Sequence, residues 1–180
     1  MYDVIIVGAG PAGTAAALYA REYGLKCILL DKAEFPRDKV CGDALSGKSV
    51  RIMTELNMLE DVGKLDGAGI NRLTFGSPNH KKFDVYLKAT KNNRHIKKGF
   101  VIPRTIFDNY LFERADTVTD TLQGFSVKDI LYDNNNISGI IGETKEGEEK
   151  LFKAPIVMGC DGANSIISRK IGLYEMDMDN

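Results

Sequence analysis

A glycine-rich turn near the start of the chain carries the clearest chemical signal in the sequence. Gly8, Gly10 and Gly13 form a Gly-X-Gly-X-X-Gly motif between the β-branched run Val4–Val7 and an alanine-rich segment. In such a motif the first glycine allows a tight turn and the second lets a pyrophosphate approach the backbone. The third permits close packing of the following helix on the strand. The free amides of that helix N-terminus attract phosphate, so the motif predicts a dinucleotide-binding turn.

An acidic residue at the end of the next predicted strand supports this interpretation. The apolar run Cys27–Leu30 is followed by Asp31, whose carboxylate can accept hydrogen bonds from the hydroxyl groups of an adenosine ribose. The turn and the acid serve FAD and NAD equally well, so they leave the choice between these two dinucleotides open. An acid at this position disfavours a 2′-phosphate, which makes NADP the least favoured tightly held ligand.

Two kinds of predicted strand indicate the architecture that must position these residues. The continuous apolar runs Val4–Val7 and 156–158 are typical of parallel strands buried on both faces, whereas the strands between residues 67 and 99 alternate. We predict an α/β, Rossmann-like domain with a mainly parallel sheet, formed by residues 1–66 and 100–180. Residues 67–99 are expected to be inserted antiparallel strands of an incomplete substrate domain. The predicted helices cover residues 12–23, 45–57, 105–115 and 163–171.

Composition excludes several classes of protein. The chain has 180 residues, of which 43% are hydrophobic and 27% are charged, and its formal net charge is −1. No segment reaches the roughly 18 apolar residues of a membrane span, and no signal peptide is visible, so a cytoplasmic location is expected. The near-neutral charge argues against nucleic acid as a partner. Cys27, Cys41 and Cys160 are odd in number and widely spaced, so neither a disulfide framework nor a metal site follows.

A basic run is the one local departure from neutral charge. Between Lys81 and Lys98 seven basic residues stand against the single Asp84. The simplest interpretation is a solvated face of the alternating strands. A sharper one is peripheral contact with anionic lipid or with an acidic redox partner. His80 and His95 lie in the same polar segment without a metal or catalytic spacing, and we expect both to be solvated.

Three later segments resemble signatures of the geranylgeranyl reductase family. They are Lys-Val-Cys-Gly-Asp-Ala-Leu at 39–45, Pro-Arg-Thr-Ile-Phe-Asp-Asn-Tyr-Leu at 103–111, and Gly-Cys-Asp-Gly-Ala-Asn-Ser at 159–165. This family belongs to the flavoproteins that are folded like para-hydroxybenzoate hydroxylase. The resemblance runs from Met1 to about Leu173, with the segments in the family's order. It implies that the bound dinucleotide is FAD.

The resemblance also implies roles for individual residues around the nucleotide. The residues implied to hold the FAD diphosphate are Gly8, Gly10, Ala12 and Gly13. Asp31, with Lys32 beside it, is implied to hold the adenosine ribose. Arg104 is implied to reach the diphosphate or the ribose edge. The main chain at Asp161, in the family's Asp-Gly motif, is implied to close over the nucleotide.

The Cys41–Gly42 pair is implied to pass close to the flavin ring, which makes Cys41 a candidate catalytic residue. The family has a run of small residues here, and Asp43 departs from that pattern. Simpler alternatives stay open for three of the residues. Cys41 could be an inert packing residue, Arg104 could be a surface residue in the first turn of a helix, and Asp161 could be a helix N-cap.

The function implied by the resemblance is that of an FAD-dependent oxidoreductase. It would take electrons from a donor such as NAD(P)H and reduce a C=C bond of an isoprenoid or another hydrophobic, lipid-like substrate. Family members are longer and carry a later Gly-Asp-Ala segment that this sequence lacks, so we expect an N-terminal fragment that is inactive alone. Alternatives are a flavin monooxygenase or halogenase on the same scaffold, and a non-catalytic nucleotide-binding module.

Overall fold

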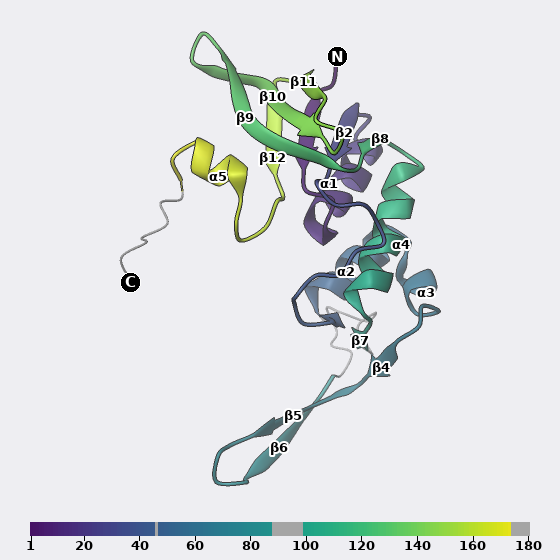
Figure 1. The fold of residues 1–180 in the computed structure, drawn as a ribbon. Coiled ribbons are helices and arrows are strands. Elements are labelled where there is room, and N and C mark those ends of the chain that lie inside the picture. The colour runs from purple at the N-terminus through teal and green to yellow at the C-terminus, as the bar shows by residue number, and fades with distance from the viewer. Residues whose placement is uncertain (46, 88–98, 174–180) are drawn as a thin grey trace. The chain divides into compact units, whose positions relative to one another are not determined.

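The computed structural model describes residues 1–45, 47–87 and 99–173 of the chain (Figure 1). The helices are α1 (Pro11–Glu22), α2 (Lys48–Glu55), α3 (Leu59–Val62), α4 (Arg104–Asp116) and α5 (Ile166–Lys170). The first strands are β1 (Val4–Val7), β2 (Cys27–Leu30), β3 (Ala44–Leu45), β4 (Ala68–Ile70), β5 (Arg72–Gly76) and β6 (Lys82–Tyr86). The later strands are β7 (Gly99–Val101), β8 (Asp120–Leu122), β9 (Phe125–Asp133), β10 (Asn136–Thr144), β11 (Glu149–Lys153) and β12 (Ile156–Gly159).

The chain divides into two compact units, which are described separately. The first unit combines Met1–Arg37 with Asp108–Asn180, and the second is Asp38–Phe107. The expected domain limits, after residues 66 and 99, do not coincide with these boundaries. The difference arises because the short strand β3, which follows Asp43, pairs with β7. Residues 38–66 therefore group with the strands that the sequence marked as an insertion.

A four-stranded parallel sheet forms the centre of the first unit. Its order is β12-β1-β2-β8, with Val4 of β1 beside Ile156 on one side and Cys27 on the other. All four residues of β1 and all four of β2 are buried. The predicted α/β class and the predicted parallel sheet are therefore confirmed. The prediction succeeded for β1 and β2 because continuous apolar runs are typical of strands that are covered on both faces.

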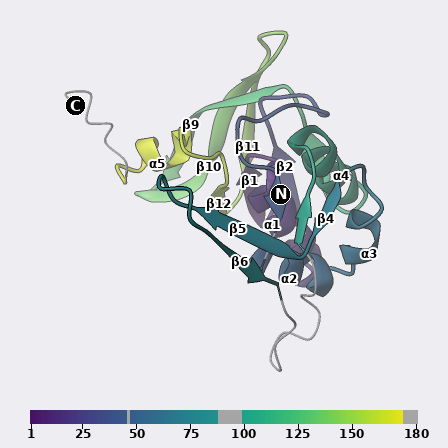
Figure 2. The ribbon, with the colours of Figure 1, turned by 90° about the horizontal axis from the view of Figure 1, so that it is seen from below.

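Two different layers cover the two faces of this sheet (Figure 2). On one face, Val4 and Ile6 pack with residues of α1 and α4, among them Ala17 and Phe112. On the other face, the core is completed by the antiparallel sheet β11-β10-β9 and by α5. The residues of this second core are Ile5, Val7, Ile28, Leu30, Phe125, Ile130, Ile140, Ala154 and Ile167. The alternation of side chains along β1 therefore supplies both cores.

The antiparallel sheet of the first unit is built on a long hairpin. β9 and β10 each have nine residues, and they are joined at Asn134 and Asn135, with φ of 47° and 65°. Asparagine tolerates this left-handed conformation, and two such residues in succession fit the twist of a hairpin. The predicted turn in the asparagine run is confirmed. The prediction of short strands was wrong here, because Phe125 and Ile130 of β9 and Ile140 of β10 all contribute to the core against the parallel sheet, which requires long strands.

Two further expectations from the sequence were wrong. The run at 156–158 was expected to be buried on both faces, but β12 is an edge strand, and Ile156 and Met158 are 52% and 41% exposed. An apolar run indicates that a strand packs against a hydrophobic core. It does not show whether the strand has a neighbouring strand on both sides. The predicted helix at 45–57 begins only at Lys48, because Gly47 has a φ of 50°, and it ends at Glu55.

The second unit contains the sheet β3-β7-β4 and the separate hairpin β5-β6. In the hairpin Leu73 pairs with Val85 and Phe75 with Phe83, so all four apolar side chains lie on one face. The two phenylalanine rings stack at 5.0 Å, and all four side chains are exposed. His80 is exposed in the connecting turn. His95 and most of the basic run lie outside the described residues. No helix in the described part of the chain is long and apolar enough to cross a membrane.

Candidate nucleotide-binding site

The glycine-rich turn lies at the carboxyl end of β1, at the entry to α1. Gly8 has a φ of +100°, and a Cβ atom there would lie 2.4 Å from the carbonyl oxygen of Cys160. The Gly8 N–H donates to the carbonyl of Leu30 at 2.7 Å. Gly8 is therefore required both by its backbone conformation and by the close approach of the segment that follows β12.

Gly13 and Gly10 meet very different surroundings. A Cβ atom on Gly13 would lie 1.8 Å from the carbonyl oxygen of Gly8, so α1 packs against the turn without room for a side chain. A Cβ atom on Gly10 would have only one neighbour within 4 Å among the described residues, Nη2 of Arg37 at 3.5 Å. The backbone at Gly10 therefore faces open space, as the approach of a phosphate requires.

The N-terminus of α1 is free to bind an anion. Gly10 is its N-cap residue and Pro11 follows, and neither a side-chain cap nor an acidic residue occurs in the fully described first turn. The first amides of a helix have no partner within the helix, and together with the helix dipole they favour a negative charge. The arrangement therefore fits a phosphate group.

Asp31 has a structural role that the sequence analysis did not assign. Its Oδ2 accepts a hydrogen bond from the Ala9 N–H at 2.7 Å, and its Oδ1 accepts one from the Ala33 N–H at 2.8 Å. The carboxylate thus ties the glycine-rich turn to the end of β2. A carboxylate oxygen has a second lone pair, so the expected hydrogen bonds to a ribose stay compatible with this geometry. Lys32 is exposed beside it.

We expect Asp31→Ala to weaken both the fold and nucleotide binding. Two backbone amides in a half-buried turn would lose their acceptor, which corresponds to about 1–3 kcal/mol of stability. Thermal unfolding and FAD titration measure the two effects. Asp129→Asn serves as control, because Asp129 is an exposed partner of Lys170 away from the turn. An unchanged FAD affinity in Asp31→Ala would contradict the assignment of this residue to the site.

The Asp161 side chain binds the start of α5, but the N-cap residue of this helix is Ser165, not Asp161 as the alternative from the sequence had it. Its Oδ1 accepts from the Ser165 hydroxyl at 2.6 Å, and its Oδ2 accepts from the Ile166 amide at 2.7 Å. The preceding residue, Cys160, donates its N–H to the Val7 carbonyl at 2.7 Å. Burial, with a smaller contribution from the charge of Asp161, raises the pKa of the Cys160 thiol. The main chain of this segment borders the turn at Gly8, while the Asp161 carboxylate holds α5.

Arg37 belongs to the site and was missed in the sequence. Its guanidinium lies beside Gly10, 4.8 Å from the ring centroid of Phe35, and its Nη1 is 2.9 Å from Oδ2 of Asp108. Asp108 follows Arg37 by 71 positions. No local pattern connects two residues so far apart. The sequence offered one signal for Arg37. It is a basic residue six positions after Asp31, in the loop that follows β2 at the carboxyl end of the strands, where the glycine-rich turn also lies.

The second unit holds two further segments that were predicted to meet the cofactor: Cys41–Gly42, near the flavin ring, and Arg104, near the diphosphate or the ribose edge. Cys41 and Gly42 are exposed, and Gly42 faces open space. The Ile102 N–H donates to the Asp43 carbonyl at 3.0 Å, continuing the pairing of β3 with β7. This pairing brings the Cys41–Gly42 segment beside the chain that leads into α4, at whose first position Arg104 lies. Two segments that are far apart in the sequence are thus neighbours within this unit.

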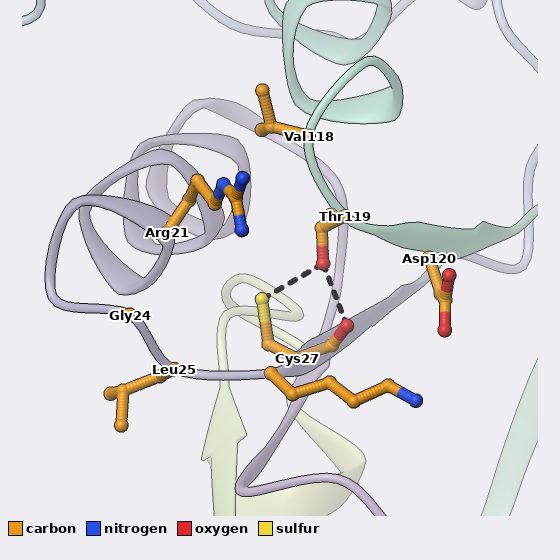
Figure 3. Close-up of a pocket in the computed structure, with 8 residues that line it drawn as sticks. Arg21, Gly24, Leu25, Cys27, Val118, Thr119 and Asp120 are labelled. Carbon is orange, nitrogen blue, oxygen red and sulfur yellow. Dashed lines mark hydrogen bonds between the residues drawn. The ribbon is translucent and has the colours of Figure 1, made fainter.

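The structure also contains a pocket at the other end of the parallel strands, away from the glycine-rich turn, and this pocket is not the candidate site (Figure 3). It has a volume of about 370 Å³ and lies at the amino ends of β2 and β8. Within it, the Thr119 hydroxyl donates to the Cys27 carbonyl at 2.6 Å and lies 2.9 Å from Sγ of Cys27. Ligands of open α/β sheets bind at the carboxyl ends of the strands. The glycine-rich turn lies at that end, and this pocket does not.

Comparison with known proteins identifies the family. The profile of a family described as FAD binding domain matches residues 1–179. The chain belongs to this FAD-binding domain family. The FAD-binding domain is 32% identical over 174 residues to digeranylgeranylglycerophospholipid reductase 1 of Methanopyrus kandleri, covering 96% of this chain and 42% of the relative. It is 28% identical over 172 residues to a 1H-pyrrole-2-carbonyl peptidyl-carrier protein brominase of Pseudoalteromonas luteoviolacea, with coverage of 94% and 39%.

The fold of the FAD-binding domain also matches solved structures. A flavoprotein/dehydrogenase from Cytophaga hutchinsonii superposes with a TM-score of 0.85 at 25% identity, and the match covers 95% of this chain and 42% of that one. The chain thus spans about two fifths of the length of the proteins that it matches. FAD is the cofactor of this family. The open backbone at Gly10 and the uncapped start of α1 fit its diphosphate.

Proposed function

We propose that the chain is the nucleotide-binding part of an FAD-dependent oxidoreductase of the geranylgeranyl reductase type. The reaction would be reduction of a C=C bond in an isoprenoid or other hydrophobic substrate, with NAD(P)H as external electron donor. The observation that carries the proposal is the open helix N-terminus at Gly10, flanked by Asp31 and Arg37. The reductase from Methanopyrus kandleri supports the choice of reaction.

Each candidate residue has a role in this proposal. The amides that follow Gly10 bind the diphosphate, together with the guanidinium of Arg37, and Asp31 binds the adenosine ribose. The segment Cys41–Gly42 borders the flavin ring, and the side chain of Arg104 reaches the diphosphate or the ribose edge. When FAD is bound, its reduced ring supplies the hydride, and the protein contributes binding, orientation and electrostatics.

The inserted strands are proposed to belong to the substrate domain. The exposed apolar face of the β5-β6 hairpin supports a hydrophobic environment there, since Phe75 and Phe83 are 50% and 63% exposed. The brominase relative favours a second candidate, a halogenase or monooxygenase on the same scaffold. The two candidates share the nucleotide site and differ in what reacts with the reduced cofactor.

Retention of FAD by the purified polypeptide tests the nucleotide site. Flavin absorbs visible light and the amino-acid side chains do not, so visible absorption reports the bound cofactor directly. We expect FAD to bind in preference to NAD, because the chain belongs to a family of FAD-binding domains. A colourless protein that takes up no added FAD would contradict the proposal, and so would a preference for NAD.

The two candidate reactions are separated by their products. With reduced FAD and a polyprenyl lipid in the absence of oxygen, a whole protein of the reductase type adds two hydrogen atoms to each double bond that reacts, whereas the chain alone is expected to be inactive. A halogenase instead consumes oxygen and a halide ion and leaves such a lipid unchanged. Mass spectrometry of the recovered substrate distinguishes the two outcomes.

A further inference from the structure

The segment that leaves β2 is fixed to α4 at two points. The ring of Phe35 stacks on the ring of Phe112, with centroids 4.7 Å apart and an angle of 7° between the planes. The guanidinium of Arg37 pairs with the carboxylate of Asp108 at 2.9 Å. Asp108 and Phe112 are four residues apart on α4, so they share one face of the helix. The helix thus offers one apolar and one charged contact to a single short segment.

The Asp108 side chain is the unusual member of this arrangement, because it is fully buried. Its exposed fraction is 0%, whereas that of the Arg37 side chain is 18%. Burying a carboxylate is unfavourable unless a cation and hydrogen bonds compensate for the lost water. No nucleotide contact has been assigned to Asp108. A buried carboxylate that pairs with a guanidinium beside Gly10 therefore calls for an explanation through that guanidinium.

The ion pair restricts where the Arg37 guanidinium can lie. Nη1 faces Asp108 and the plane lies over the Phe35 ring, while Nη2 lies 3.5 Å from the position of a Cβ atom on Gly10. A guanidinium has five N–H donors in a fixed planar fork. With one edge held by the carboxylate, donors of another nitrogen remain beside the turn. This is the place where the amides of α1 offer their own hydrogen bonds.

We propose that Asp108 is a positioning residue for the diphosphate of the bound nucleotide, acting through Arg37. This inference rests on the proposed function, because it concerns the same site. The carboxylate fixes the guanidinium before the ligand arrives, so that the phosphate oxygens meet oriented donors and less conformational entropy is lost on binding. Asp108 itself touches neither the nucleotide nor the substrate in this proposal.

A double-mutant cycle tests the proposal, with ADP and FAD as probes. We expect Asp108→Asn and Arg37→Ala each to weaken binding about tenfold, the effect of one charge-assisted hydrogen bond. The double variant should bind no more weakly than Arg37→Ala alone, because in this proposal the carboxylate affects the nucleotide only through the guanidinium of Arg37. Glu113→Gln is the matched control, since it makes the same change of charge at an exposed position of α4 and should bind like wild type.

The outcomes separate this inference from the function on which it rests. If wild type binds neither ADP nor FAD, the proposed function fails. If wild type binds both and folded Asp108→Asn binds them equally well, only the positioning role fails. A loss from Asp108→Asn that persists in the Arg37→Ala background also overturns it, because the carboxylate would then act independently of Arg37.

A second variant keeps the test decisive if Asp108→Asn does not fold. Arg37→Met combined with Asp108→Leu replaces the buried pair by apolar side chains of similar size, which proteins often tolerate. We expect this variant to unfold near the wild-type temperature and to bind ADP about tenfold more weakly. Binding of ADP at wild-type strength by this variant would show that the pair has no role in the site.

Discussion

The Gly13→Ala variant is expected to be less stable than a variant with alanine at either of the other two glycines of the turn. The new Cβ atom would lie 1.8 Å from the carbonyl oxygen of Gly8. Neither atom can move alone, because one belongs to α1 and the other to the turn that β1 enters. The helix must shift off the strand, at a cost of about 3 kcal/mol. A small domain has a total stability of about 5–15 kcal/mol, so much of it is lost.

Chemical denaturation followed by circular dichroism measures this loss. Gly10→Ala is the matched control, because it adds the same methyl group three residues earlier, where the nearest atom is 3.5 Å away. The control should unfold close to wild type. Equal stability of the Gly13→Ala and Gly10→Ala variants would show that the close approach of helix and turn does not exist in the protein.

Gly10→Val is expected to have the opposite effect, with the fold retained and nucleotide binding lost. Gly10 has a φ of −71° and an extended ψ, a conformation that valine adopts readily. Its γ-carbons would occupy the space through which a phosphate reaches the amides of α1. Loss of two hydrogen bonds to a charged group weakens binding about 100-fold. FAD fluorescence titration reports the affinity, and thermal unfolding confirms the fold.

A remote glycine supplies the control for this substitution. Gly76 ends β5 in the second unit, and a Cβ atom there would contact only the flexible side chain of Lys82 at 4.0 Å. Gly76→Val should therefore leave FAD affinity unchanged. If Gly10→Val also bound FAD normally, the diphosphate would have to lie elsewhere, and the assignment of the glycine-rich turn would be wrong.

The glycine-rich turn between β1 and α1 could be predicted because its determinants are local. The strand Val4–Val7, the three glycines and Asp31 all lie within the first β-α-β unit, and each acts through neighbours that the sequence places beside it. The strand Cys27–Leu30 was predicted to the residue for the same reason. Helix α4 was predicted to within one residue at each end.

The features that escaped prediction depend on contacts between distant segments. The exposure of Ile156 follows from the place of β12 at the edge of the sheet, which its own residues do not encode. The strand β3 exists only because β7 is available to pair with it. The role of Arg37 depends on Asp108, a residue that the sequence analysis quoted only as part of a family signature. Contacts between distant segments of this kind produce no periodic pattern in the sequence from which they could be predicted.

The position of β1 at the centre of its sheet has a consequence for biosynthesis. Val4 pairs with Ile156, so one neighbour of the first strand is among the last parts of the described chain to leave the ribosome. Contacts between such distant segments form slowly, whereas the β9-β10 hairpin can close as soon as it emerges. The carbonyl of Cys160 that packs against Gly8 also arrives at this late stage. Capture of the coenzyme should therefore follow translation of nearly the whole domain and complete its maturation.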